Sequence, residues 1–178
     1  MDCETGRIGR EVSLLSTHLA VCDTNWEVLD TLLLLTKPDD GNYVVTAEAL
    51  AINKIDLIAH DKVALTYSQA GGKLREWLWK HSRNGKVKLQ PMGKNVPFDV
   101  EKVTDNVLGK KTWNQYVSYR CYDLTPLVTY LKRKGKLAPD APESLEGLAN
   151  YINFKFVPHT ADGDNYAGIA VIKWLESL

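Results

Sequence analysis

The chain has 178 residues and a mass of 20.0 kDa; 44% of its residues are hydrophobic and 25% are charged, so we expect a single globular domain, residues 1–178. The longest apolar run, Leu32 to Leu35, is too short to cross a bilayer, and no signal-like apolar stretch follows the N-terminus, which excludes a membrane protein. The three cysteines are odd in number and widely spaced, which argues against disulfides or structural zinc and favours a reduced, cytoplasmic compartment.

The net charge of zero hides three blocks of opposite sign. Residues 1–62 carry 11 acids and 5 bases, residues 63–136 carry 15 bases and 5 acids, and residues 137–178 carry 6 acids and 2 bases. This pattern is typical of a protein that binds a polyanion on a basic face and holds cations with carboxylates elsewhere. The alternative is that the charge blocks are merely solvated faces.

The first third of the chain reads as strands and the rest as alternating helices and strands. Leu, Val and Thr dominate residues 13–36, with the turn signal CDTN between two apolar runs, so a β-hairpin is predicted there. Apolar spacing, capping residues and Gly or Pro stops then predict further elements. Helices are expected at a short segment capped by Thr46, over 67–81, 96–107 and 125–134, over 144–152 with Ser144 as its cap, and over 162–178. Strands are expected over 86–92 and 117–124. This order predicts an α/β fold with a mixed sheet flanked by helices.

Two acids fall on or beside the apolar faces of predicted helices. Asp164 lies one turn before Ala167 on the apolar face of the last helix, and Asp99 lies beside Val96 and Val100. A buried ionised carboxylate is costly unless it is paired, hydrogen-bonded or bound to a metal. The alternative for each is that it only stabilises a helix N-terminus.

Asp2 and Glu4 supply a complementary pair of carboxylates. Residues i and i+2 of a strand project from the same face, so this DxE sequence presents two carboxylates side by side. Hard oxygen ligands of this kind suit magnesium or manganese. By residue type alone, Asp30 or the Asp39-Asp40 pair is equally eligible.

His159 stands in the sequence PHTADGD, five positions before Asp164. A histidine near a metal-bound water can accept its proton near neutral pH; otherwise it is a solvated residue at the start of a helix. We read His18 as a sheet residue and His60 and His81 as surface residues.

Together these stretches resemble the DEDDh family of 3′→5′ exonucleases, which includes the proofreading subunits of bacterial DNA polymerases. Three blocks occur in the order of that family: DCETG at 2–6, GKNVPFD at 93–99 and HTADGD at 159–164. The resemblance spans essentially the whole chain. It implies a ribonuclease-H-like fold with a mixed five-stranded sheet and helices on both sides.

The resemblance also implies a two-metal site for Mg or Mn. Asp2, Glu4 and Asp164 would ligate the metal pair, Asp99 would hold the second ion through water, and His159 would be the general base. Two ions of this kind stabilise both the attacking and the leaving oxygens of a cleaved phosphodiester.

Four further residues are implied in binding the substrate. Thr5 and the backbone around Gly6 would contact the 3′-terminal nucleotide. Asn95 and Phe98 are candidates for the same role, the alternatives being that Asn95 caps a helix and Phe98 packs. The expected partners are single-stranded DNA or RNA 3′ ends; a polymerase or other replication partner is left open.

The chain departs from the family pattern at two positions. Lys94 replaces the usual histidine of the second block. Met1 is the only residue before Asp2, whereas the first strand of the family runs through several apolar residues before this acid. We expect either that the true chain starts upstream or that the sheet tolerates a truncated first strand in which Asp2 is poorly held. If truncation abolishes metal binding, the alternative function is a catalytically impaired nucleic-acid-binding module on the same fold.

Overall fold

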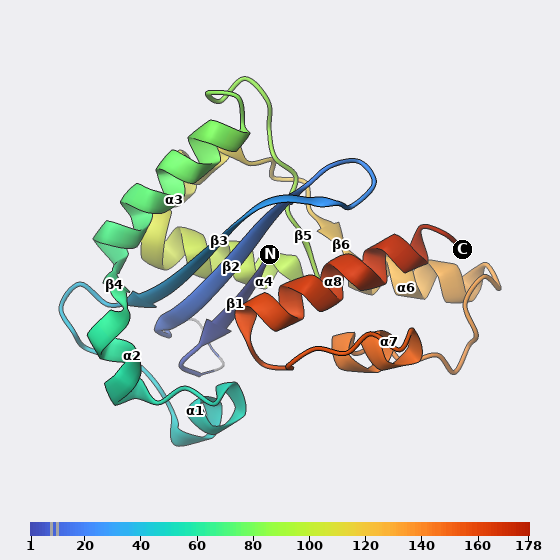
Figure 1. Cartoon of the computed structure of the whole chain (residues 1–178), viewed down its shortest axis with the longest axis horizontal. Coiled ribbons are helices and arrows are strands. Elements are labelled where there is room, and N and C mark those ends of the chain that lie inside the picture. Colours follow the sequence, from blue (N-terminus) through green and yellow to red (C-terminus); the bar gives the residue numbers. More distant parts are fainter. Residues whose placement is uncertain (8, 10) are drawn as a thin grey trace.

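A computed structural model describes residues 1–7, 9 and 11–178, and Figure 1 shows how its elements are arranged. In chain order the elements are β1 (Asp2–Thr5), β2 (Leu14–Cys22), β3 (Val28–Lys37), α1 (Ala47–Asn53), α2 (Leu57–Val63), β4 (Leu65–Thr66), α3 (Tyr67–His81), β5 (Met92–Gly93), α4 (Val96–Val103), the π-helix η1 (Thr104–Leu108), α5 (Lys110–Tyr116), β6 (Tyr122–Asp123), α6 (Leu124–Arg133), α7 (Leu145–Tyr151) and α8 (Ala161–Leu175).

A mixed sheet with the strand order β1-β2-β3-β4 lies at the centre of the molecule. β2 pairs antiparallel with β1 on one side and with β3 on the other, and β4 lies parallel to β3. The predicted hairpin is therefore confirmed. Its turn is held by Asp23, whose Oδ1 accepts the backbone N–H groups of Asn25 and Glu27.

The sheet is covered on both faces because successive side chains of β2 point in opposite directions. Ala20 and Cys22 pack with the core built mainly by α6, α7 and α8. Leu19 and Val21 pack with a second core, which contains side chains of α3, α4 and α5. In Figure 1, α8 begins beside β1 and α4 passes behind the strands. This layering brings the start of α8 next to β1, where the candidate site lies.

The longer helices form where their apolar spacing and caps predicted them. α3 covers the predicted range, and the hydroxyls of Thr46 and Ser144 cap α1 and α7 as expected. Gly71 has a packing role, because a Cβ there would lie 2.6 Å from the carbonyl oxygen of Val107. α3 and η1 can thus approach closely. Among the described residues, no helix is both long and apolar enough to cross a membrane.

Two short helices and one histidine differ from the sequence interpretation. α2 and α5 were not predicted, since each buries a single side chain and offers no apolar stripe. The interpretation of His60 as a surface residue was wrong. His60 is 7% exposed, and its Nε2 lies 2.9 Å from the carbonyl oxygen of Thr36, which ties α2 to β3.

The mixed α/β fold is confirmed, but the strands are not joined in one five-stranded sheet. In the described part of the chain, β5 and β6 form a separate parallel pair, preceded by a bridge between Leu89 and Val117. Pro91 lacks an N–H and interrupts the strand predicted over 86–92. β1 begins at Asp2. The residue before it, Met1, contacts β5, because its amino group donates to the carbonyl oxygen of Met92 at 2.7 Å.

Candidate metal centre

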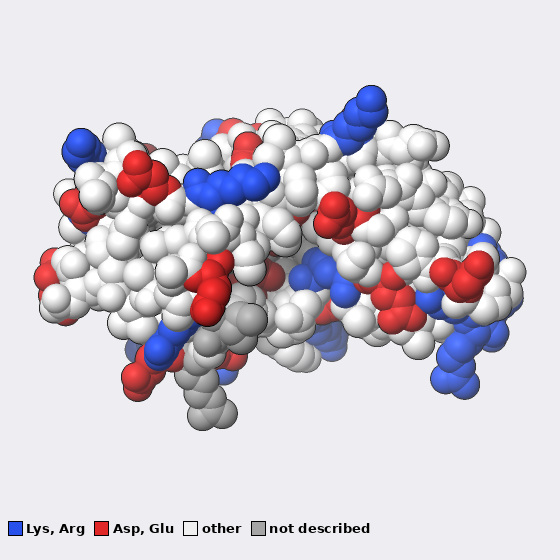
Figure 2. Space-filling view, turned by 90° about the horizontal axis from the view of Figure 1, so that it is seen from below, with Lys and Arg blue, Asp and Glu red and all other residues white. Residues whose placement is uncertain are grey.

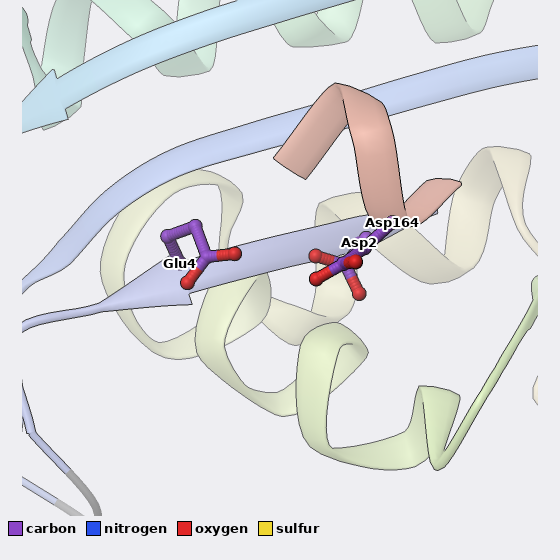
Figure 3. Close-up of side chains that lie close together, drawn as sticks. All are labelled: Asp2, Glu4 and Asp164. Carbon is purple, nitrogen blue, oxygen red and sulfur yellow. The ribbon is translucent and has the colours of Figure 1, made fainter. Parts of the chain in front are cut away.

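Three carboxylates from two elements converge beside the central sheet. Asp2 and Glu4 project from the same face of β1, and Asp164 lies in the first turn of α8. Each offers one oxygen, and these oxygens all lie within 4.8 Å of one another. Figure 3 shows Asp2 and Asp164 side by side and Glu4 further along β1. Residues separated by 160 positions in the chain thus form one acidic cluster.

Asp99 adds a fourth acid to the electrostatics of this cluster. It lies in the first turn of α4 and is only 4% exposed. Its charge raises the pKa of Asp2 and of Glu4, in both cases after the larger effect of burial. Asp99 is therefore buried, as its place beside the apolar face of this helix indicated, and its charge acts on the cluster.

The acids of the cluster resist ionisation. Burial is the main cause, and repulsion by neighbouring carboxylates adds to it. Together they raise the pKa of Asp2 well above its usual range and that of Glu4 to about 7. Burial also raises the pKa of Asp99 and of Asp164, although the backbone N–H of His159 partly offsets this effect at Asp164.

This donor set fits a divalent cation. Among the described residues, neither the three acids of the cluster nor Asp99 forms an ion pair with a basic side chain. Several buried carboxylates within a few ångströms repel one another unless a cation lies between them. All of the ligand atoms are hard carboxylate oxygens, which suit Mg²⁺ or Mn²⁺.

A buried polar contact fixes the start of α8 against the sheet. The side-chain amide of Asn165 lies 2.9 Å from Nδ1 of His18 and donates to the backbone oxygen of His18 at 3.2 Å. His18 is the residue of β2 that stands opposite Asp2 in the strand register. The contact therefore holds Asp164 next to Asp2. The sequence analysis missed Asn165, since nothing in the local sequence pairs it with a residue 147 positions away.

His159 lies at the surface, immediately before α8. Its backbone has φ = 61°, and its N–H donates to Oδ2 of Asp164 at 3.2 Å. The side chain is exposed. The residue thus contacts the cluster through its backbone, while its ring faces solvent at the edge of the site.

The four residues expected to bind substrate differ in how many of their polar groups are already hydrogen-bonded within the protein and in how exposed their side chains are. Both backbone groups of Gly6 are engaged, since its N–H donates to Ser13 and its carbonyl accepts from Thr46. The hydroxyl of Thr5 donates to the carbonyl of Arg7 at 3.0 Å. The remaining two residues lie at the start of α4. Asn95 is exposed, has φ = 57° and makes no side-chain capping bond. Phe98 is half-buried, and the Nζ of Lys102 lies 5.2 Å from the centre of its ring.

The basic middle block does not form a free patch on the face that Figure 2 shows, where Lys and Arg side chains lie dispersed among acidic ones. Several of its bases are also engaged within the molecule. Lys80 pairs with Asp30 at 3.0 Å and Lys132 pairs with Glu143 at 2.8 Å. The Nζ of Lys102 is buried and donates to the carbonyl of a residue in the loop after β1, Gly9.

Comparison with solved structures assigns the fold of the whole chain. A structure of exonuclease I superposes with a TM-score of 0.75 and 18% sequence identity, over 99% of this chain and 40% of that chain. The fold is that of exonuclease I. The expected resemblance is therefore confirmed at the level of the fold, since exonuclease I is a DEDDh 3′→5′ exonuclease of the ribonuclease-H-like superfamily.

Two further structures of exonuclease I from E. coli carry single-stranded DNA. The complex with a dT13 oligonucleotide has a TM-score of 0.72 and 18% identity, and a zinc-bound complex with single-stranded DNA has a TM-score of 0.71 and 19% identity. This chain spans about 40% of the length of these proteins. No protein-family profile and no curated protein sequence matches the chain.

Proposed function

We propose that this chain is a metal-dependent nuclease that removes nucleotides from the 3′ end of single-stranded DNA by hydrolysing phosphodiester bonds. The convergence of Asp2, Glu4 and Asp164 within 4.8 Å carries this proposal. The fold supports it, because exonuclease I has been solved with single-stranded oligonucleotides.

In this proposal Asp2, Glu4 and Asp164 hold the divalent ions, and Asp99 supports them from the adjoining helix. When bound, the ions supply Lewis-acid stabilisation of the attacking and leaving oxygens. The backbone N–H of His159 orients Asp164 by the hydrogen bond that it donates. We further propose that the imidazole of His159, which is exposed at the rim of the site, accepts a proton from the attacking water.

The proposed reaction balances as a hydrolysis. Water loses a proton to the imidazole of His159 and forms a bond to phosphorus, and the bond between phosphorus and the 3′ oxygen of the preceding nucleotide breaks. That oxygen takes up a proton from solvent. The products are a nucleoside 5′-monophosphate and a strand shortened by one nucleotide with a free 3′-hydroxyl.

Substrate contacts are proposed for the exposed rim of the site. Phe98 offers a half-exposed ring on which a base can stack, and Asn95 is exposed beside it. Thr5 lies at the end of β1, next to the acidic cluster. Such contacts require unpaired bases, so we propose that single strands and frayed ends are cut in preference to intact duplex.

The test follows a 5′-labelled single-stranded oligonucleotide with Mg²⁺ or Mn²⁺. We expect a ladder of labelled products that shorten one nucleotide at a time. Asp164→Asn should slow the reaction by about 100-fold or more, since even outer-shell changes at metal sites cost about 10–100-fold. Asp162→Asn is the matched control, because Asp162 is exposed in the same turn of α8 and should retain activity.

Two results would contradict the proposal. Immediate release of a labelled mononucleotide would show the opposite direction of cleavage. A folded wild-type chain that binds the oligonucleotide without shortening it would indicate a binding module in place of an enzyme. The same assay with an RNA strand of equal sequence measures the preference between the two nucleic acids.

A further inference from the structure

The loop after α3 and the segment from α5 to β6 carry a block of positive charge that the proposed site does not use. Residues 82–90 and 109–121 contain no aspartate or glutamate. Their six basic side chains are all exposed and are Arg83, Lys86, Lys88, Lys110, Lys111 and Arg120. Among the described residues, none of the six forms an ion pair with an acidic side chain. No contacting acid therefore neutralises these positive charges.

The two segments lie side by side and form one surface. Leu89 of the loop pairs with Val117 in a parallel bridge. The Nζ of Lys88 donates to the carbonyl oxygen of Asn114 near the end of α5 at 2.7 Å. A Cβ on Gly85 would lie 3.8 Å from a backbone oxygen of the same helix, so the middle of the loop also packs on α5. We call the surface formed by these two segments the basic surface.

The basic surface lies within reach of the acidic cluster. Lys88 stands seven positions before Asn95, which is exposed at the rim of the site. A chain of that length spans at most about 25 Å when it is fully extended. In Figure 1 the loop after α3 forms the top of the molecule, so the basic surface lies away from the face that Figure 2 shows from below. A single strand of several nucleotides can therefore contact the site and the basic surface at once.

The side chains among the bases suit a nucleic acid better than a membrane. Tyr119 is 81% exposed, and the guanidinium of Arg120 lies 5.5 Å from the centre of its ring. Bases stack on exposed aromatic rings of this kind while neighbouring cations contact phosphates. The exposed amides of Asn114 and Gln115 add hydrogen-bond donors for phosphate oxygens. A helix that binds a membrane presents apolar side chains to it, whereas the exposed residues of α5 are all polar.

We propose that the basic surface binds the sugar–phosphate backbone of a single-stranded nucleic acid, and that a strand whose 3′ end enters the metal centre continues over it. The second part rests on the proposed nuclease function, and the first part does not. The exposed bases contact phosphates, and Tyr119 stacks with a base. Binding of this kind is independent of base sequence and weakens steeply as the salt concentration rises.

The first test measures the binding of a fluorescent dT strand of roughly 20 nucleotides, which exceeds the usual site size of about 4–16. Anisotropy is recorded in EDTA, so that no strand is cut and no metal ion contributes. The variant Lys86→Gln/Lys111→Gln/Arg120→Gln removes three charges from the basic surface. We expect it to bind about 100-fold more weakly at 0.1 M salt and to lower the slope of log K against log salt by about 2, because each phosphate contact of a single strand contributes about 0.7.

A matched variant controls for the loss of overall charge. Lys62→Gln/Arg133→Gln/Lys134→Gln also removes two exposed lysines and one exposed arginine, all outside the basic surface, and should bind the strand as the wild type does. Tyr119→Ala removes no charge and should weaken binding by about 5–150-fold, the equivalent of one stacked base, without changing the salt slope.

The second test adds Mn²⁺ and compares the dT strand of roughly 20 nucleotides with one of about four, the lower end of single-strand site sizes. The variant of the basic surface should lower kcat/KM for the long strand and leave the short one unchanged. Equal losses on both lengths would overturn the continuation of the strand over the basic surface. A wild-type chain that binds the long strand through the basic surface but never shortens it would support the surface and refute the nuclease proposal.

Two results in EDTA would overturn the basic surface itself. One is equal binding of the long strand by the variant of the basic surface and by its matched control. The other is a variant of the basic surface that keeps its affinity for the strand but loses binding to vesicles of anionic lipid, which would assign these bases to a membrane.

Discussion

Replacing Glu4 by Gln should make the metal-free protein more stable above neutral pH. In the folded chain the pKa of Glu4 is about 7, against 4.5 for an unperturbed glutamate, because of burial first and of Asp164 and Asp99 second. The folded state therefore holds its proton to a higher pH than the unfolded state does. The stability that the protonated side chain contributes is complete below pH 4.5 and is lost as the pH rises to 7.

The size of the effect follows from this difference in pKa. Ionising Glu4 costs the folded chain about 3 kcal/mol relative to the unfolded chain, and solvent screening lowers this to about 2 kcal/mol. Gln cannot ionise and avoids this cost. At pH 8, Glu4→Gln should thus raise the melting temperature by about 4–8 °C, whereas at pH 4.5 the two proteins should melt together.

Thermal unfolding in EDTA between pH 4.5 and 8 measures this effect. Glu48→Gln is the matched control, since Glu48 is exposed in the first turn of α1 and should show no such pH dependence. Adding Mn²⁺ should reverse the order, because the wild-type chain gains about 2.7 kcal/mol at 100 times its Kd and the variant gains less. The reasoning is refuted if Glu4→Gln is less stable than the wild type at pH 8 without metal, or if its advantage is equal at pH 4.5.

Three further substitutions test separate parts of the site and the fold. Asn165→Ala leaves His18 without its amide partner. We expect the free energy of unfolding, measured in urea, to fall by about 1–3 kcal/mol and Mn²⁺ binding, measured by calorimetry, to weaken. An unchanged Mn²⁺ affinity would show that the contact does not position Asp164. His159→Ala should slow oligonucleotide shortening by about 10²–10⁴-fold with little change in oligonucleotide affinity, measured by single-turnover kinetics and fluorescence anisotropy; if both fall together, the histidine is not the base. Gly71→Ala should destabilise the chain by about 1–3 kcal/mol, because its Cβ would lie 2.6 Å from a backbone oxygen of η1; an unchanged urea midpoint would show that α3 and η1 separate easily.

The sequence was sufficient for features that depend on local pattern. The DxE spacing of Asp2 and Glu4 placed both acids on one strand face, and the capping hydroxyls of Thr46 and Ser144 marked two helix starts correctly. The position of Asp164 at the start of an amphipathic helix also followed from spacing. Each of these features is set by residues within a few positions of one another.

Features that depend on distant contacts were beyond the sequence. β5 and β6 are only two residues long and pair with each other instead of joining the central sheet, and this pairing of residues 30 positions apart does not show in local propensity. α2 is held by a buried hydrogen bond from His60 to β3, and its own sequence lacks the apolar stripe that identifies a helix. The basic block of residues 63–136 left open whether it forms a binding face or only a solvated one, because the sequence does not show that Lys80 pairs with an acid 50 positions away.

The proposed roles of the carboxylates depend on whether the acidic cluster binds divalent ions. This is measured directly by anomalous diffraction from crystals grown with Mn²⁺ and a short single-stranded oligonucleotide. The account predicts an anomalous peak among the carboxylates of Asp2, Glu4 and Asp164, and the loss of that peak in Asp164→Asn. Density for manganese elsewhere on the surface, with none between β1 and the start of α8, would contradict it.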